Sequence, residues 1–140
     1  HRQTNELEPH TRCKPSGGSR QFLTPYGVEF VELPQIERVF IFDIGGPHTV
    51  RTVFMDGRSH PRDFTPTYYG HSIGWWEGDT LVVDTTGYNE GFWLDRRGVP
   101  TTTQLHTIER AGHSAHLSHP EGVAALVRRA LELGSAGASR

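Results

Sequence analysis

The sequence predicts a mainly β domain: a small, curved antiparallel sheet or barrel of about six strands with one C-terminal helix. Short runs of β-branched and aromatic residues alternate with turn residues over 26–110. Apolar residues at helical spacing occur only near the end of the chain. At 140 residues, the chain is long enough to bury a core without disulfide or metal cross-links.

Composition divides the chain into four segments. Residues 1–25 are polar and include Pro15-Ser16-Gly17-Gly18, which predicts an irregular N-terminal arm. Residues 26–110 carry the strand patterns and form the β-rich domain. Residues 111–134 are expected to contain an approach segment and the helix, followed by a tail over 135–140.

Three strands are expected in the first part of the β-rich domain. Their apolar runs begin at Val28, Val39 and Val50. The breaks between them contain Pro34 and the run Gly45-Gly46-Pro47, and the third run stops at Asp56-Gly57, a pair that favours turns. These short connections predict antiparallel neighbours.

A hairpin is the clearest pattern in the second part. After a linker over 58–69, Ile73–Trp76 and Thr80–Asp84 flank a Glu-Gly-Asp turn. A sixth strand is expected over Gln104–Arg110. Adjacent Trp75 and Trp76 must point to opposite faces of the sheet, so one of them needs cover, for which a second subunit in a homo-oligomer is one source.

The C-terminal helix is predicted from a single apolar stripe. Residues at spacings of three and four form it: Val123, Leu126, Val127, Ala130 and Leu131. Ser118 and Glu121 make a capping-box pattern at its start.

Charge and cysteine content exclude some classes of partner. The formal net charge is −2 and the isoelectric point is about 6.5. We therefore expect no nucleic-acid partner, which would need a clustered basic surface. No run of about 18 apolar residues occurs, so no membrane span is expected. The single cysteine, Cys13, has no partner for an intrachain disulfide and is expected to be buried.

A serine-hydrolase hypothesis starts from the run Gly70-His71-Ser72-Ile73-Gly74. It matches the nucleophile elbow G-x-S-x-G, in which a strained turn between a strand and a helix exposes the serine. The hairpin pattern that follows Ser72 argues against an elbow, because the helix after the serine supplies the oxyanion-hole amide.

Six segments carry a distinctive pattern of short motifs. They are Cys13–Arg20, Thr24–Gly27, Met55–Pro61, Gly70–Gly74 with Trp76–Thr85, Trp93–Asp95 and Leu105–His106. On these segments, residues 13–110 resemble an uncharacterised family of bacterial proteins that are predicted to be secreted. The resemblance implies a secreted or periplasmic location and brings no established reaction.

The end of the chain resembles a different family. Residues 111–134, with the run Ala-Gly-His-Ser-Ala-His at 111–116, resemble the C-terminal end of α/β-hydrolases. That resemblance implies His113 as the triad base, with Ser72 as nucleophile and Asp84 or Asp95 as the orienting acid. An α/β-hydrolase also needs several βαβ units, and the sequence offers no other helical stretch.

A metal-site hypothesis starts from the nine histidines in the chain. His60, His71 and His106 lie in the motif segments, and three imidazoles from separate strands would form an open site for zinc, copper or iron. Glu109 and Asp84 are the expected supporting carboxylates. The alternative is that these are loop and surface histidines, because no compact metal-binding motif occurs.

Aromatic residues suggest a place for a small organic or sugar-like ligand. We expect Tyr69, Trp76 and Trp93, with the carboxylate of Asp95, to line it. The alternative is that these rings form the core and its lid.

The preferred hypothesis is a β domain that binds a small molecule or a transition metal near His60, His71 and His106. Whether it is an enzyme stays open at this point. A serine hydrolase using Ser72 and His113, and a structural or self-assembling protein without an active site, are the alternatives.

Overall fold

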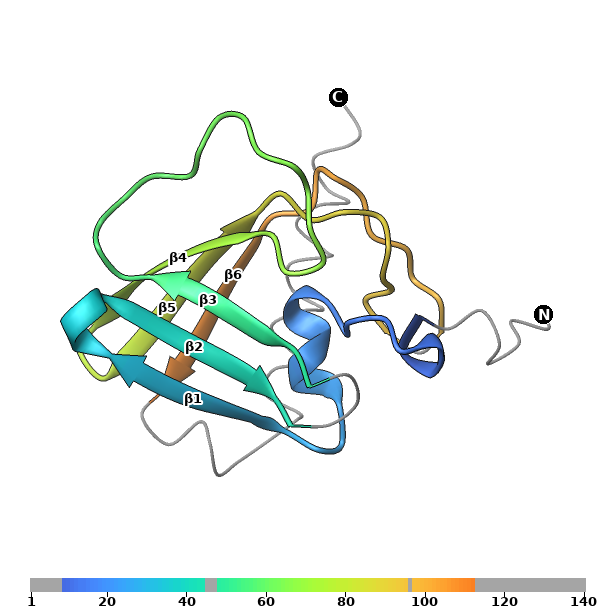
Figure 1. Ribbon diagram of the computed structural model, residues 1–140, viewed down its shortest axis with the longest axis horizontal. Coiled ribbons are helices and arrows are strands. Elements are labelled where there is room, and N and C mark those ends of the chain that lie inside the picture. Colours follow the sequence, from blue (N-terminus) through green and yellow to red (C-terminus); the bar gives the residue numbers. More distant parts are fainter. Residues whose placement is uncertain (1–8, 45–47, 96, 113–140) are drawn as a thin grey trace.

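The computed structural model describes residues 9–44, 48–95 and 97–112, which fold around one curled sheet (Figure 1). The sheet forms a half-barrel of six strands, so the predicted mainly β fold class is confirmed. The predicted C-terminal helix, the tail and His113 lie outside the described residues. Within the described part, no helix is long and apolar enough to cross a membrane.

The strands lie in the sheet in the order in which they occur along the chain. They are β1 (Val28–Leu33), β2 (Arg38–Asp43), β3 (Val50–Phe54), β4 (His71–Glu77), β5 (Thr80–Thr86) and β6 (Thr107–Gly112). The predicted strands and the hairpin β4–β5 are all present, and the sixth begins at Thr107 rather than Gln104.

One pairing differs from the expected antiparallel sheet. β3 and β4 are parallel, with Val53 opposite Ser72 and Phe54 opposite Ile73, whereas every other pair is antiparallel. Residues 55–70 form a long crossover loop that returns to the end of the sheet at which β3 began (Figure 1). A parallel neighbour requires such a long connection, which composition alone does not distinguish from a long hairpin loop.

The core lies on the concave face of the half-barrel. Alternate residues of the central strands are buried there: Val39, Ile41, Val53, Leu81 and Val83. Burying each of these side chains is worth roughly 1.5–3 kcal/mol. Phe22 packs on this cluster from outside the sheet, and so links the N-terminal segment to the core.

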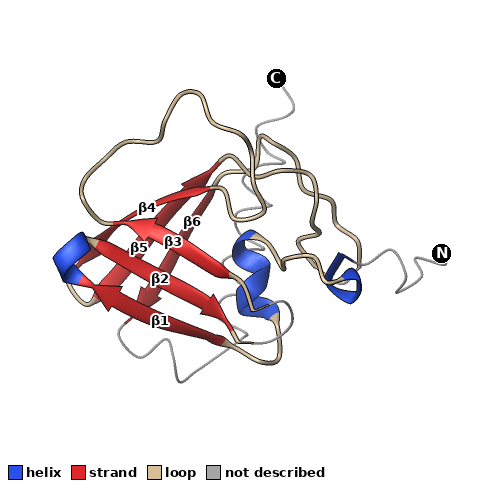
Figure 2. Cartoon of the chain, in the orientation of Figure 1, coloured by secondary structure: helices blue, strands red, loops and turns tan. Residues whose placement is uncertain are grey.

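The described part of the N-terminal segment, residues 9–25, is more regular than the predicted irregular arm. These residues include the 3₁₀ helices η2 (Pro9–Arg12) and η3 (Gly18–Leu23), and η3 lies beside the sheet (Figure 2). A third, η4 (Pro34–Ile36), joins β1 to β2. Helices this short contain too few residues to show an apolar period, which is why the sequence pattern missed them. Cys13, expected to be buried, is exposed.

A second apolar cluster, in the loop after β5, packs against the N-terminal segment. Tyr88, Phe92 and Leu94 are buried together there. Gly17 has φ 75°, and a Cβ at this position would lie 2.3 Å from the Phe92 ring. Glycine is therefore required for this close approach.

Gly87 is expected to be equally intolerant of a side chain. Its φ is 73°, and an added Cβ would lie 1.7 Å from Cζ of Phe64 in the crossover loop. We expect Gly87→Ala to lower the free energy of unfolding by about 2 kcal/mol, from left-handed strain and displacement of the ring. Urea denaturation of the variant and the unmodified protein measures this loss of stability. Gly57→Ala is the control, because Gly57 has the same φ but no atom within 4 Å of the added Cβ; equal losses in both variants would contradict the steric explanation.

Candidate functional site

Neighbouring residues on β4 and β5 supply two clusters on opposite faces of the sheet. His71 and Ser72 are consecutive on β4, and Asp84 and Thr85 are consecutive on β5. Successive side chains of a strand point to opposite faces. Ser72 and Thr85 are buried on the concave face, and His71 and Asp84 are partly exposed on the other face.

The outer cluster, called here the imidazole cluster, consists of His60, His71, Asp84 and His106. The two Nδ1 atoms of His60 and His71 are 3.0 Å apart. Asp84 Oδ1 lies 2.5 Å from Nε2 of His106 and 3.6 Å from Nε2 of His60. The three histidines singled out from the sequence thus come together from the crossover loop, β4 and the segment before β6.

The contact between His60 and His71 constrains their protonation. Two Nδ1 atoms 3.0 Å apart make a good contact only when one of them carries the shared proton. Burial lowers the pKa of His71, and the neighbouring His60 and Arg58 lower it further. His71 packs on Phe54, with ring centroids 5.0 Å apart. His71 is therefore held as a neutral partner for His60.

The second ring nitrogen of His60, Nε2, is not used in the contact with His71. Nε2 is buried and has no hydrogen-bond partner among the described residues, since its 3.6 Å separation from Asp84 Oδ1 is longer than a hydrogen bond. The His106 side chain is 51% exposed, against 20% for Asp84, so the cluster opens to solvent on this side. A buried polar atom without a partner marks a place where a bound group would be stabilised.

The side chains as they lie do not form a metal centre. Within residues 9–44, 48–95 and 97–112, no group of three or more His, Cys, Asp and Glu is spaced to hold a metal ion. One physical reason is the 2.5 Å contact between Asp84 and His106. Donors that each lie about 2.0–2.2 Å from one tetrahedral ion must be roughly 3 Å or more apart.

The inner cluster, called here the Arg51 network, contains Arg51, Ser72, Thr85 and Glu109. The Arg51 side chain is 1% exposed, and its Nη1 forms an ion pair with Glu109 Oε2 at 2.6 Å. Arg51 donates hydrogen bonds to Ser72 Oγ at 2.9 Å and to Thr85 Oγ1 at 2.5 Å. Ser72 and Thr85 also bond to each other. Tyr88 lies nearby, and burial raises its pKa to about 12, so it remains neutral.

Glu109 does not join the histidines, contrary to the sequence-based expectation. It pairs with Val83 in the sheet register and faces the concave side, where it neutralises Arg51. Asp84 and Glu109 lie on neighbouring strands, but Asp84 is opposite Ile108. The one-residue offset places the two carboxylates on opposite faces.

The Ser72 elbow is not formed. Ser72 lies inside β4, is 1% exposed and bonds to Arg51 and Thr85. The chain continues into a hairpin rather than a helix. Asp84, one of its expected triad partners, lies on the opposite face. A nucleophile needs access to substrate, so the geometry gives no support to Ser72 in that role.

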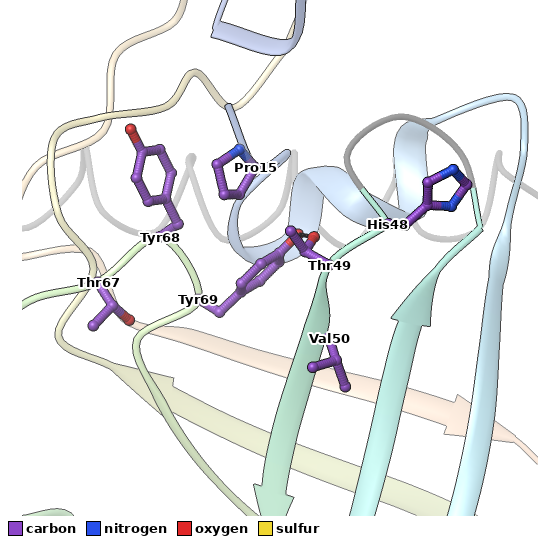
Figure 3. A pocket seen from close by; sticks show the side chains of 7 residues that line it. All are labelled: Pro15, His48, Thr49, Val50, Thr67, Tyr68 and Tyr69. Carbon is purple, nitrogen blue, oxygen red and sulfur yellow. Dashed lines mark hydrogen bonds between the residues drawn. The ribbon is translucent and has the colours of Figure 1, made fainter. Parts of the chain in front are cut away.

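The four predicted ligand-binding residues lie at separate places. Tyr69 lines an open pocket (Figure 3). Trp76 lies near the β4–β5 turn and is 44% exposed, and the neighbouring Trp75 is 40% exposed. Neither tryptophan is therefore buried in the described part. Trp93 pairs with Pro100, and Asp95 accepts backbone N–H bonds from its own loop.

Sequence reasoning missed the role of Arg51 and Thr85. The available signal was two consecutive polar residues in each strand of the hairpin, His71-Ser72 and Asp84-Thr85, where simple alternation expects one polar and one apolar residue. Such pairs indicate that both faces of the sheet carry polar groups.

Comparison with known proteins does not identify a relative of this chain. No family model matches the chain, and no curated protein or solved structure matches it.

Proposed function

We propose that the imidazole cluster binds a transition-metal ion, which in turn holds a small ligand. The observation that carries the proposal is the position of His60 Nε2. It is buried, lacks a hydrogen-bond partner in the described part, and faces the carboxylate to which His106 is already bonded. Two imidazole nitrogens and a carboxylate, brought together from three chain segments, are the donors that borderline metals prefer.

Three side chains are assigned as ligands: His60 and His106 through Nε2, and Asp84 through its carboxylate. Three protein ligands leave a fourth position for water or a ligand, as in open metal sites. His71 supports the site by its Nδ1 contact with His60, since the second ring nitrogen of a ligating histidine is normally held by another group.

Metal binding must open the short contact between Asp84 and His106. His106 lies just before β6 and its side chain is half exposed, so it has room to move away from the carboxylate. The ion then replaces the proton shared in that contact, and binding releases protons. Zinc, copper and iron all suit this donor set, and an ion with an open position supplies Lewis-acid or redox chemistry to a bound molecule.

Calorimetric titration of chelator-treated protein with Zn²⁺, Cu²⁺ and Fe²⁺ tests the proposal. We expect one ion per chain, with proton release seen as a dependence of the binding enthalpy on the buffer. Affinity should fall as the pH drops below about 6.5, where free imidazole protonates.

A matched histidine outside the cluster provides the control. His48 is exposed in the segment before β3, so His48→Gln should bind like the unmodified protein. Absence of saturable binding for all three ions, or equal binding by a variant that lacks both His60 and His106, would contradict the proposal.

A further inference from the structure

A pocket distinct from the imidazole cluster lies where the N-terminal segment meets the crossover loop. Its volume is about 460 Å³, within the range of roughly 300–1,000 Å³ that is usual for small-molecule sites. The lining comes from three parts of the chain: Pro15, His48, Thr49, Val50, Thr67, Tyr68 and Tyr69 (Figure 3).

The chemistry of the wall favours an uncharged, hydroxylated ligand. Among the seven described lining residues none is an Asp, Glu, Lys or Arg, and only His48 can carry a charge, so the described lining offers little to compensate a charged ligand. Two tyrosine rings and a proline provide flat apolar surface, and the hydroxyls of Thr49 and Thr67 provide hydrogen-bonding groups. Flat rings beside hydroxyl partners suit a sugar, which has apolar C–H faces and a polar rim.

The two tyrosines are held in place before any ligand arrives. The Tyr69 hydroxyl bonds to the Thr49 hydroxyl. The Tyr68 ring packs against Phe92 in the second apolar cluster, with centroids 6.4 Å apart. Because these side chains are already ordered, binding a ligand costs little side-chain entropy.

We propose that this pocket binds a neutral sugar ring, stacked on the tyrosines, with its hydroxyls bonded to the threonines. The site shares no residue with the imidazole cluster, so it does not depend on metal.

Two-dimensional ¹H–¹⁵N NMR with neutral glycosides tests this. The probes are methyl β-D-glucopyranoside, methyl α-D-mannopyranoside and cellobiose, each added to the full chain. We expect at least one to shift the amide signals of Val50, Thr67 and Tyr69 saturably. Its dissociation constant should be in the millimolar range, as is usual for a ligand of this size in an open pocket.

Val50→Trp is the blocking variant. Val50 lines the pocket but is 46% exposed, so a larger side chain fills the pocket without entering the core. We expect it to weaken sugar binding at least 10-fold. Val99→Trp, at a valine that is 37% exposed outside the lining, should bind as the unmodified protein does.

Three results would overturn the proposal. The first is that none of the three glycosides gives saturable shifts. The second is that p-cresol binds at the same amides while the sugars do not, which would make the pocket a site for phenols. The third is that Val50→Trp binds sugar as tightly as Val99→Trp does.

Discussion

Replacing Arg51 by methionine is expected to lower the free energy of unfolding by about 3–5 kcal/mol. The substitution leaves Glu109 mostly buried without its counter-charge, and it removes the donors to Ser72 and Thr85. Removing one member of a buried ion pair lowers the free energy of unfolding by more than the intact pair contributes to it. The reason is that the remaining charge stays buried without a partner. Urea denaturation followed by circular dichroism measures the loss.

Two further variants separate this explanation from a general effect of losing an arginine. Arg110 pairs with Glu77 at 3.6 Å, with both side chains about half exposed, so Arg110→Met should cost less than about 1 kcal/mol. The double variant Arg51→Met with Glu109→Leu should be more stable than Arg51→Met alone, since no buried charge remains. A loss in Arg51→Met no larger than that in Arg110→Met would contradict the role assigned to the network.

The second large effect is expected on metal affinity. Asp84→Asn and His106→Ala should each weaken binding by more than about 100-fold, because each removes a donor to the ion, whereas outer-shell partners typically contribute about 10–100-fold. His71→Phe should fall within that smaller range, because it leaves the donors intact and removes only the group that holds His60. Calorimetric titration of each variant with the ion that binds the unmodified protein measures the change.

Glu109→Gln distinguishes the structural assignment from the one expected from the sequence. Glu109 lies on the concave face with Arg51, so its substitution should leave metal affinity within about 3-fold, provided that thermal unfolding confirms a folded variant. A loss like that of Asp84→Asn would mean that the ligand set is wrong. Equal affinities in His71→Phe and the unmodified protein would remove His71 from its supporting role.

Local patterns predicted the strands well because each depends on neighbouring residues. The apolar run that begins at Val28, and the hairpin of β4 and β5, both follow from β propensity and turn residues within a few positions. The short 3₁₀ helix η3 was missed because its stability comes from packing on the sheet through Phe22 rather than from its own periodicity.

The sequence singled out the histidines of the candidate site but did not predict how they are arranged. Their recurrence in motif segments singled out His60, His71 and His106, and the fold brings them to one face. Of the two carboxylates expected beside the histidines, Asp84 lies with them and Glu109 lies with Arg51. A shift of one position along a strand exchanges the faces, and register depends on pairing with residues far away in the chain.

The sequence by itself determined the class of fold, the approximate strands and the residue types able to carry chemistry, because propensity and patterning act over a few residues. Only the tertiary structure decided the parallel pairing of β3 with β4, the burial of Ser72 beside Arg51, and the separation of Tyr69 from the imidazole cluster. Each of these is set by contacts between residues distant in the sequence, where the free energy of packing and charge pairing outweighs local preference.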